Sequence, residues 1–324
     1  MIQGYLYHPE RKLTRLATLE EARAAVDDPE VTLWLDLQAE SGETLQRLGE
    51  LFGLNPGSID DADDNDQRPR IDDYGAYLFI VMYASLAPED PPEFAPRQLA
   101  LFLSRNYLIT VHNQPIRALK TAADRVCRLP DRALGRGVDI HFFHIADYLV
   151  DNFVICAESY EDVLDTLDEE SMSPDCDSNV LTNLAQVQRT LIRMRRMASA
   201  QRELAAQIAG GEYEYISDEV DRRFEHIYQH LTHAFELIEG MRETCHSIRD
   251  NYYALLAERT NKLMRTLTIF SAFLLPMTFL TGFYGMNLHL WPASDSPYGM
   301  AFVVILLSTT ALCMLIYFRK RKWL

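Results

Sequence analysis

The chain lacks several patterns that mark common protein classes. Its five cysteines contain no Cys-x-x-Cys pair, which argues against a disulfide framework and against a structural zinc site. Basic residues are in the minority, with 31 Lys and Arg against 47 Asp and Glu, and the net charge is −16. Nucleic acid is not an expected partner, because binding it requires a clustered basic surface.

Catalytic motifs are missing as well. The sequence contains no Gly-x-x-x-x-Gly-Lys-[Ser/Thr] phosphate-binding loop, and no nucleophile, base and orienting group assemble from its motifs. We therefore expect neither an enzyme nor a catalytic cofactor. The first residues, Met1–Leu13, lack an apolar signal core, so the N-terminus is expected to stay in the cytosol.

Two C-terminal stretches contain no charged residue. They are Leu267–Met286 and Gly299–Phe318. Each has about twenty residues, or roughly 30 Å of helix, which matches the hydrocarbon core of a bilayer. Because backbone polar groups in lipid must be satisfied internally, each stretch is predicted to be a transmembrane helix.

The distribution of basic residues predicts the orientation of these spans. Lys262 and Arg265 precede the first span, the tail at residues 319–324 is rich in Lys and Arg, and the connection at residues 287–298 contains neither. Cytosolic segments carry the excess of positive charge. We expect both termini in the cytoplasm, a short outer loop at 287–298, a second span at 299–318, and an inner (plasma) membrane location.

The N-terminal part is predicted to be an α+β cytosolic domain at residues 1–137. Runs rich in β-branched and aromatic residues predict strands, and capping residues predict two helices, at Ser41–Phe52 and from Asn55-Pro56 onward. Residues 138–211 are predicted to form long antiparallel helices, interrupted at Met172-Ser173-Pro174. The predicted strands are Val31–Leu37, Tyr77–Tyr83, Gln98–Leu103 and Tyr107–His112.

A long stalk helix is predicted within residues 212–286. Apolar residues recur every three or four positions from Phe224 to Leu255, and no proline occurs between Pro174 and Pro276. A helix over residues 217–283 would be about 100 Å long and would run from the cytosol into the first span. So long an apolar stripe predicts helices bundled along their length.

One face of this helix changes from polar to apolar and back to polar. A pore-lining helix can use this order, with polar rings for a hydrated ion and an apolar constriction between them. A helix–helix contact is the alternative interpretation. The face comprises Asp250, Asn261, Met264, Leu267, Ser271, Leu275, Thr278 and Gly282.

Asn287 follows the first span and favours the pore interpretation. A ring of amides from several copies would offer oxygen atoms to a cation that keeps its water, and Mg²⁺ dehydrates reluctantly. A charged ring would hold a divalent ion too tightly for release.

The run Tyr284-Gly285-Met286-Asn287, the two C-terminal spans and the basic tail resemble the CorA family of magnesium and cobalt channels. The resemblance implies a funnel-shaped homopentamer in which Tyr284, Gly285, Met286 and Asn287 form the selectivity entrance. It also implies passive influx of partly hydrated Mg²⁺ or Co²⁺, driven by the membrane potential. The expected partners are further copies of the chain, the lipid bilayer and divalent cations.

The same resemblance implies a cytosolic regulatory metal site at Asp60 and Asp61, with His226 where an opposing carboxylate is usual. Histidine is a poor Mg²⁺ ligand and a good Zn²⁺ ligand. A ZntB-like, proton-coupled zinc transporter therefore stays open as an alternative. A membrane-anchored coiled-coil scaffold or sensor that conducts nothing is a third hypothesis.

Overall fold

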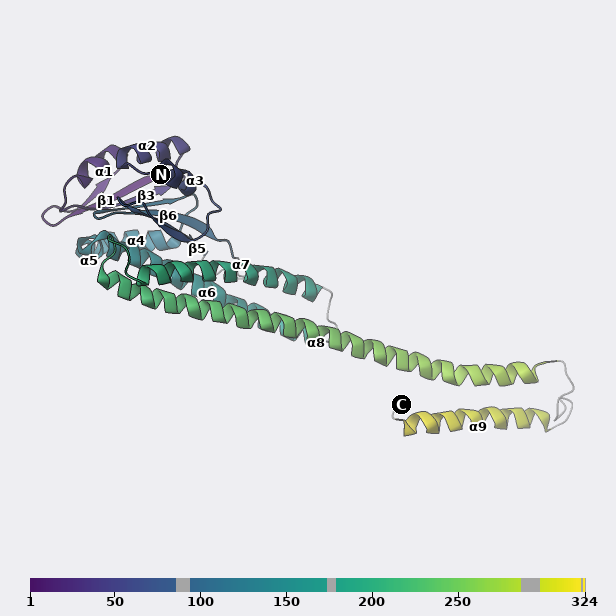
Figure 1. Ribbon diagram of the computed structural model, residues 1–324. Helices are drawn as coiled ribbons and strands as arrows, with labels where there is room; N and C mark the ends of the chain where they lie inside the picture. Colours follow the sequence, from purple (N-terminus) through teal and green to yellow (C-terminus); the bar gives the residue numbers. More distant parts are fainter. Residues whose placement is uncertain (86–93, 174–178, 287–297, 322, 324) are drawn as a thin grey trace. The chain divides into compact units, whose positions relative to one another are not determined.

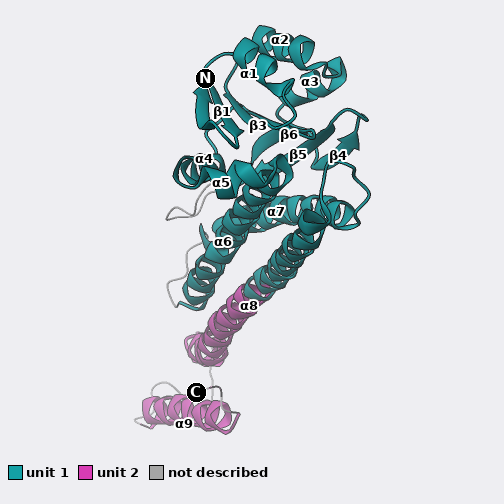
Figure 2. Cartoon of the chain, turned by 90° about the vertical axis from the view of Figure 1, so that its left-hand side faces the viewer, with its two compact units in different colours: residues 1–249 teal, residues 250–324 magenta. Residues whose placement is uncertain are grey.

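The computed structural model describes residues 1–85, 94–173, 179–286, 298–321 and 323. The chain separates into two compact units, residues 1–249 and residues 250–324. Figures 1 and 2 show the elements of each unit. Unit 1 contains the sheet and most of the helices, whereas unit 2 contains the end of one long helix and the last helix.

A seven-stranded sheet organises unit 1, in the order β2-β1-β3-β7-β6-β5-β4. Strands β3 and β7 pair in parallel, and the other neighbours are antiparallel. The short strands β2 and β4 are thus outermost. The strands are β1 (Ile2–His8), β2 (Lys12–Leu16), β3 (Thr32–Gln38), β4 (Arg70–Asp73), β5 (Leu78–Ala84), β6 (Arg97–Leu103) and β7 (Tyr107–His112).

Helices cover both faces of this sheet (Figure 1). Helices α1 (Leu19–Val26), α2 (Gly42–Phe52) and α3 (Pro56–Asp63) pack on one face. The other face carries α4 (Arg117–Arg128), α6 (Val138–Met172), α7 (Asn179–Ala209) and the first part of α8 (Asp218–Tyr284). Between α4 and α6 lie α5 (Pro130–Ala133) and a 3₁₀ turn, Leu134–Arg136.

Strand β5 is a continuous apolar run because both of its faces are buried. Its side chains alternate between the two cores, Ile80 and Met82 on the α6 side and Phe79 and Val81 on the α2 side. All seven residues are buried. A strand covered on both faces cannot alternate between apolar and polar residues.

The four strands predicted from composition are confirmed as β3, β5, β6 and β7. Strands β1, β2 and β4 were not predicted. Strand β2 leaves no room for a side chain at Gly4 of β1. A Cβ atom at this position would lie 2.8 Å from Cβ of Leu16 on β2. The pairing of β1 with β2 therefore depends on a residue that is usually depleted in strands.

The predicted helix starts are confirmed by side-chain caps. Ser41 accepts a hydrogen bond from the backbone N–H of Thr44, and Asn55 accepts one from Gly57. Gly53 ends α2 with φ of 67°, in the left-handed region. Such caps satisfy backbone groups that the helix leaves unpaired.

The long helices also follow the sequence pattern. Helix α6 ends at Met172 and α7 begins at Asn179, on either side of the predicted interruption. Helix α8 has 67 residues and continues through Pro276, so it is about 100 Å long. The compact unit 1 ends at Arg249, inside α8, and unit 2 adds α9 (Gly299–Lys320).

Candidate functional site

Helix α9 covers one face of the membrane-span part of α8. The rings of Phe273 and Phe318 lie 5.7 Å apart, and those of Tyr284 and Phe302 lie 6.4 Å apart. On α8, Phe273, Met277, Leu280 and Tyr284 are partly buried. At about 100° per residue these four side chains point within about 60° of one another. They define the α9-contact face of α8.

The predicted pore residues lie on the opposite face. Within the span they point within about 70° of the direction opposite to the α9-contact face, by the same helical geometry. All eight are exposed in the single chain, namely Asp250, Asn261, Met264, Leu267, Ser271, Leu275, Thr278 and Gly282. We call this surface the open face of α8.

Three positions of the open face within the span carry small side chains. They are Ser271, Thr278 and Gly282, and all three are exposed. Small residues let helices approach closely. At these positions the open face can therefore contact another helix or water.

Thr278 presents an oxygen acceptor on the open face. Its hydroxyl donates a hydrogen bond to the backbone oxygen of Leu274 at 2.8 Å. With the hydrogen directed to its own helix, the lone pairs of the hydroxyl oxygen stay available to accept. An oxygen oriented in this way can interact with a cation or with water around a cation.

The end of α8 carries the predicted entrance residues. The helix ends at Tyr284, and Gly285 continues its last turn by donating from its backbone N–H to the oxygen of Thr281 at 2.9 Å. Met286 is 54% exposed. Asn287 lies outside the described residues, so its role stays a prediction.

The predicted regulatory carboxylates belong to α3. Asp61 forms an ion pair with Arg70 of β4 at 2.6 Å, and Arg70 also pairs with Asp72 at 2.6 Å. Asp60, beside it, is exposed. Helix α3 belongs to the core on one side of the sheet and α8 to the core on the other side, so one chain does not bring these carboxylates to His226.

His226 lies in a different group of polar side chains, between α6 and α8. Its ring centroid is 4.1 Å from that of His230, and Nδ1 of His230 is 3.6 Å from a carboxylate oxygen of Asp151. Burial raises the pKa of the nearby Asp147 carboxyl, as does the charge of Asp151, while the two histidines oppose the rise. The two imidazoles therefore face an acidic surface of α6.

Among the residues that the structure describes, three helices are long and apolar enough to cross a membrane, namely α6, α8 and α9. In α6, 67% of the most apolar stretch is buried, against 0% in α8 and 6% in α9. The apolar residues of α6 pack in the core of unit 1, whereas those of α8 and α9 have few partners within the chain.

Comparison with known proteins identifies the family. The family model described as a CorA-like Mg²⁺ transporter protein matches residues 29–322. The chain belongs to the CorA family. It is 25% identical to the cobalt/magnesium transport protein CorA of Thermotoga maritima over 298 residues, covering 92% of this chain and 85% of the relative.

A solved CorA structure has the same fold. The CorA magnesium transporter from Methanocaldococcus jannaschii superimposes with a TM-score of 0.85 at 20% identity, covering 99% of this chain and 98% of that one. The zinc transport protein ZntB of Yersinia pestis is 26% identical over 180 residues, which are 56% of this chain and 54% of that protein. Family membership and two exposed apolar helices make this CorA-family chain a membrane protein.

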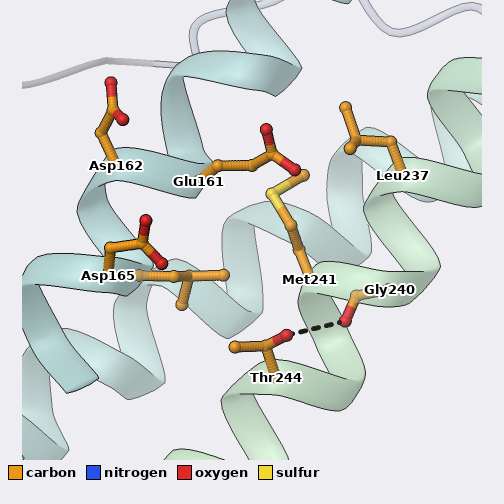
Figure 3. A pocket seen from close by; sticks show the side chains of 8 residues that line it. Glu161, Asp162, Asp165, Leu237, Gly240, Met241 and Thr244 are labelled. Atoms are coloured by element: carbon orange, nitrogen blue, oxygen red, sulfur yellow. Dashed lines mark hydrogen bonds between the residues drawn. The ribbon is translucent and has the colours of Figure 1, made fainter.

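An acidic cavity was not predicted from the CorA resemblance or from the sequence. It has a volume of about 430 Å³ between α6 and α8, and Figure 3 shows Glu161, Asp162 and Asp165 of α6 beside Met241 and Thr244 of α8. Such a surface attracts cations. Within the part of the chain that the structure describes, however, no three or more His, Cys, Asp or Glu side chains are placed to hold a metal ion.

Two contacts, one at the predicted regulatory residue Asp61 and one at His230 beside His226, were also missed. Arg70 pairs with Asp61 across 9 positions, and His230 approaches Asp151 from 79 positions away in the sequence. The charges of Asp61 and Arg70 could have suggested the first pair. No spacing rule connects two separate long helices, so nothing in the sequence indicated the second.

Proposed function

We propose that this chain transports Mg²⁺ and Co²⁺ through a pore lined by α8 in a homopentamer. The observation that carries the proposal is the open face of α8. Its small, polar and apolar residues point away from α9 and have no covering element within the chain's described residues. Copies of the chain arranged around a common axis would turn these faces toward a central pathway.

Along that pathway the side chains fall into three zones. Thr278 and Gly282 would line a polar outer part, where the threonine oxygen can accept hydrogen bonds from the water around an ion. Met264 and Leu267 would form an apolar constriction that closes by dewetting. Ser271 and Leu275 lie between these zones, and Asn261 and Asp250 would face the inner end.

The entrance would be a ring of Asn287 amides, supported by Tyr284, Gly285 and Met286. Neutral amide oxygens can bind the water shell of Mg²⁺ without removing it, because this ion dehydrates reluctantly. Weak binding of this kind also permits release into the pore. The ring would select for charge density and hydrated size.

The driving force would be the membrane potential. A potential of 100 mV supplies about 2.3 kcal/mol per elementary charge, and about twice that for a divalent ion. Arg319 and Lys320 occupy the last turn of α9, which supports cytoplasmic termini by the positive-inside rule. We place the protein in the inner membrane, with an inward cation flux.

Closure would depend on a cytosolic metal site shared between copies. Asp60 and Asp61 on α3 of one copy would face His226 on α8 of another, because α3 and α8 of one chain lie on opposite faces of the sheet. A cation bridging two copies would hold the pentamer in one conformation.

Zinc transport is the second candidate function. It is supported by the pairing of His226 with His230 at 4.1 Å between ring centroids, because imidazole is a preferred Zn²⁺ ligand. The partial similarity to ZntB points in the same direction. Coupling to protons would distinguish this function from passive influx.

Flux into proteoliposomes tests the proposal. The wild-type protein should carry Mg²⁺ and Co²⁺ at a rate that follows an imposed potential, and Asn287→Ala should lose selectivity or most of its flux. Asn251→Ala is the matched control, since it removes an exposed amide from α8 at a position about half a turn from the open face.

The alternatives give different outcomes in the same assay. Flux of Zn²⁺ that rises with an inward proton gradient would replace the Mg²⁺ assignment with zinc transport. A folded pentamer that passes no metal would support a scaffold or sensor instead. Equal flux in the Asn287 and Asn251 variants would remove Asn287 from the selectivity ring.

A further inference from the structure

A second cavity in unit 1 carries positive charge, in contrast to the acidic chain around it. It has a volume of about 740 Å³ and lies between residues 65–69, which precede β4, and the middle of α7. Four arginines line it, Arg68 from the first segment and Arg193, Arg195 and Arg196 from α7. Volumes of 300–1,000 Å³ are typical of small-molecule sites.

One of these arginines is already neutralised. Arg195 forms an ion pair with Glu239 of α8, and its guanidinium lies 5.2 Å from the ring centroid of Phe235. Arg202, two turns further along α7, lies over the same ring at 4.6 Å. These two arginines belong to the face of α7 that packs on α8.

The other three have no such partner. Within the described residues, no carboxylate oxygen lies within 4.0 Å of the guanidinium nitrogens of Arg68, Arg193 or Arg196. Asp66 and Glu203 also line the cavity, yet neither pairs with them. In a chain with 47 acidic and 31 basic residues, three unpaired arginines around one cavity repel one another unless an anion joins them.

The cavity wall is fixed by hydrogen bonds. The hydroxyl of Tyr83 donates to the backbone oxygen of Gln67 at 2.7 Å, and the backbone N–H of Gln67 donates to the side chain of Gln98 at 2.9 Å. These contacts hold the segment that carries Arg68. Because the backbone is fixed, less ordering is needed when a ligand binds.

Apolar side chains complete the lining. Phe94, Pro96 and Met197 contribute to the wall, and Phe94 is only 4% exposed. Guanidinium groups bind phosphate oxygens through paired hydrogen bonds, and an apolar wall suits the uncharged part of a ligand. The combination differs from the acidic cavity between α6 and α8, which would repel such an anion.

We infer that this cavity binds a polyphosphate group, held by Arg68, Arg193 and Arg196. The polyphosphate can belong to a nucleotide, whose base would lie against Phe94 and Pro96, or it can be free polyphosphate. None of the residues that line this cavity belongs to the open face of α8, and its occupancy can be measured without any flux.

Binding to the full-length protein in detergent tests the inference. ATP in the presence of EDTA and sodium tripolyphosphate are the two probes, measured by titration calorimetry. Saturable binding to one site per chain is expected for at least one probe. Arg193→Gln and Arg196→Gln should each raise its Kd about ten-fold, since each removes a charge-assisted hydrogen bond. Arg68→Gln should act in the same direction.

The control is Arg189→Gln, which removes an exposed arginine of α7 that does not line the cavity. It should bind like the wild type. Equal Kd values for ATP and tripolyphosphate would indicate a free polyphosphate ligand, and an ATP Kd ten-fold lower would indicate a nucleotide. Absence of saturable binding in the wild type, or equal Kd values for Arg193→Gln, Arg196→Gln and Arg189→Gln, would overturn the inference. Unchanged thermal melting of each variant excludes misfolding as the cause.

Discussion

The carboxylate of Asp61 lies 2.6 Å from a terminal guanidinium nitrogen of Arg70, and the Nε of the same guanidinium lies 2.6 Å from Asp72. A single arginine therefore holds two carboxylates on the surface between α3 and β4. Both members of the first pair are about one-third exposed, at 30% and 34%. A divalent cation that binds Asp61 competes with Arg70 for the charge of this carboxylate, so the ion pair opposes cation binding.

Removing Arg70 should let the proposed regulatory site bind Mg²⁺ at lower concentrations. Arg70→Gln leaves Asp61 free for a cation, so the Mg²⁺ concentration that gives half-maximal protection from proteolysis should fall several-fold. The loss of stability should be about 1 kcal/mol or less for each broken pair, because the pairs are partly exposed.

Asp61→Ala is the companion variant, and it should abolish the Mg²⁺-dependent part of the protection. If neither variant changes the concentration dependence, Asp61 is not a ligand at the regulatory site.

Replacing Met264 should weaken the proposed apolar constriction. Met264 is 61% exposed on the open face, and Leu263, next to it, is 71% exposed on the flank. Met264→Ser should raise resting cation flux into proteoliposomes several-fold, because a polar constriction stays hydrated.

Leu263→Ser is the control, and its flux should resemble that of the wild type. A rise of equal size in both variants would indicate a general loss of packing rather than a constriction at Met264.

A larger side chain at position 282 should leave the stability of the chain unchanged but should obstruct the proposed pore. A Cβ atom at Gly282 would meet no atom within 4 Å. Gly282→Val should therefore leave thermal melting almost unchanged, while it lowers flux at least ten-fold by narrowing the pathway of the pentamer.

Gly240, in unit 1, supplies the matched control. A Cβ atom there also meets no atom within 4 Å, and Gly240→Ala should stabilise α8 by about 1 kcal/mol, through helix propensity, with normal flux. Normal flux in Gly282→Val would place Gly282 outside the pore.

Acid should destabilise unit 1 through His141. This side chain is fully buried against Trp34, with ring centroids 4.5 Å apart. Burial, and then the charges of His144 and Arg125, lower its pKa from 6.5 to about 3. The unfolded chain therefore takes up the proton first. The neutral His141 side chain contributes fully to the stability of the folded state above pH 6.5. This contribution is lost as the pH falls below that value, at up to about 1.4 kcal/mol per pH unit.

Thermal melting at pH 7.5 and pH 5.5 measures this loss. His141→Leu should show a smaller difference between the two melting temperatures than the wild type. The exposed His233 provides the control, since His233→Leu should keep the wild-type difference. An unchanged difference in His141→Leu would show that another group dominates the acid response.

Local features of the sequence predicted much of the fold. The buried strands are apolar throughout, and the helices α2 and α3 begin at residues whose side chains cap them. The start of α9 was predicted from an uncharged stretch, and the long helix α8 was predicted from the regular spacing of its apolar residues. Each of these signals is a local pattern among residues that are near one another in the chain, which is what helix and strand periodicity reports.

Contacts between distant residues were not predictable in this way. Strand β4 has four residues and depends on β5 for its pairing. Helix α6 is also long and apolar enough to cross a membrane, and its burial in the core of unit 1 distinguishes it in the structure from the exposed stretches of α8 and α9. The approach of His230 to Asp151 likewise depends on the packing of two helices.

The candidate site was predictable in part. Helical geometry alone placed Met264, Ser271, Thr278 and Gly282 on one face, and the structure adds that α9 covers the other face. Asn287 lies outside the described residues and stays a prediction. The arginine-lined cavity could not be predicted, because residues 65–69 and α7 come together only in the folded chain.

The outermost strands of the sheet have a consequence for assembly. An unpaired strand edge is a template for adding a strand from another molecule, and short, charged edge strands prevent such growth. Here β2 has five residues, including Lys12 and Arg15, and β4 has four, including Arg70 and Asp72. Both borders of the sheet are thus protected against intermolecular strand addition and amyloid-like aggregation. Copies of the chain would therefore associate through helical surfaces. Such surfaces can form a closed ring without exposing an unpaired strand to another molecule.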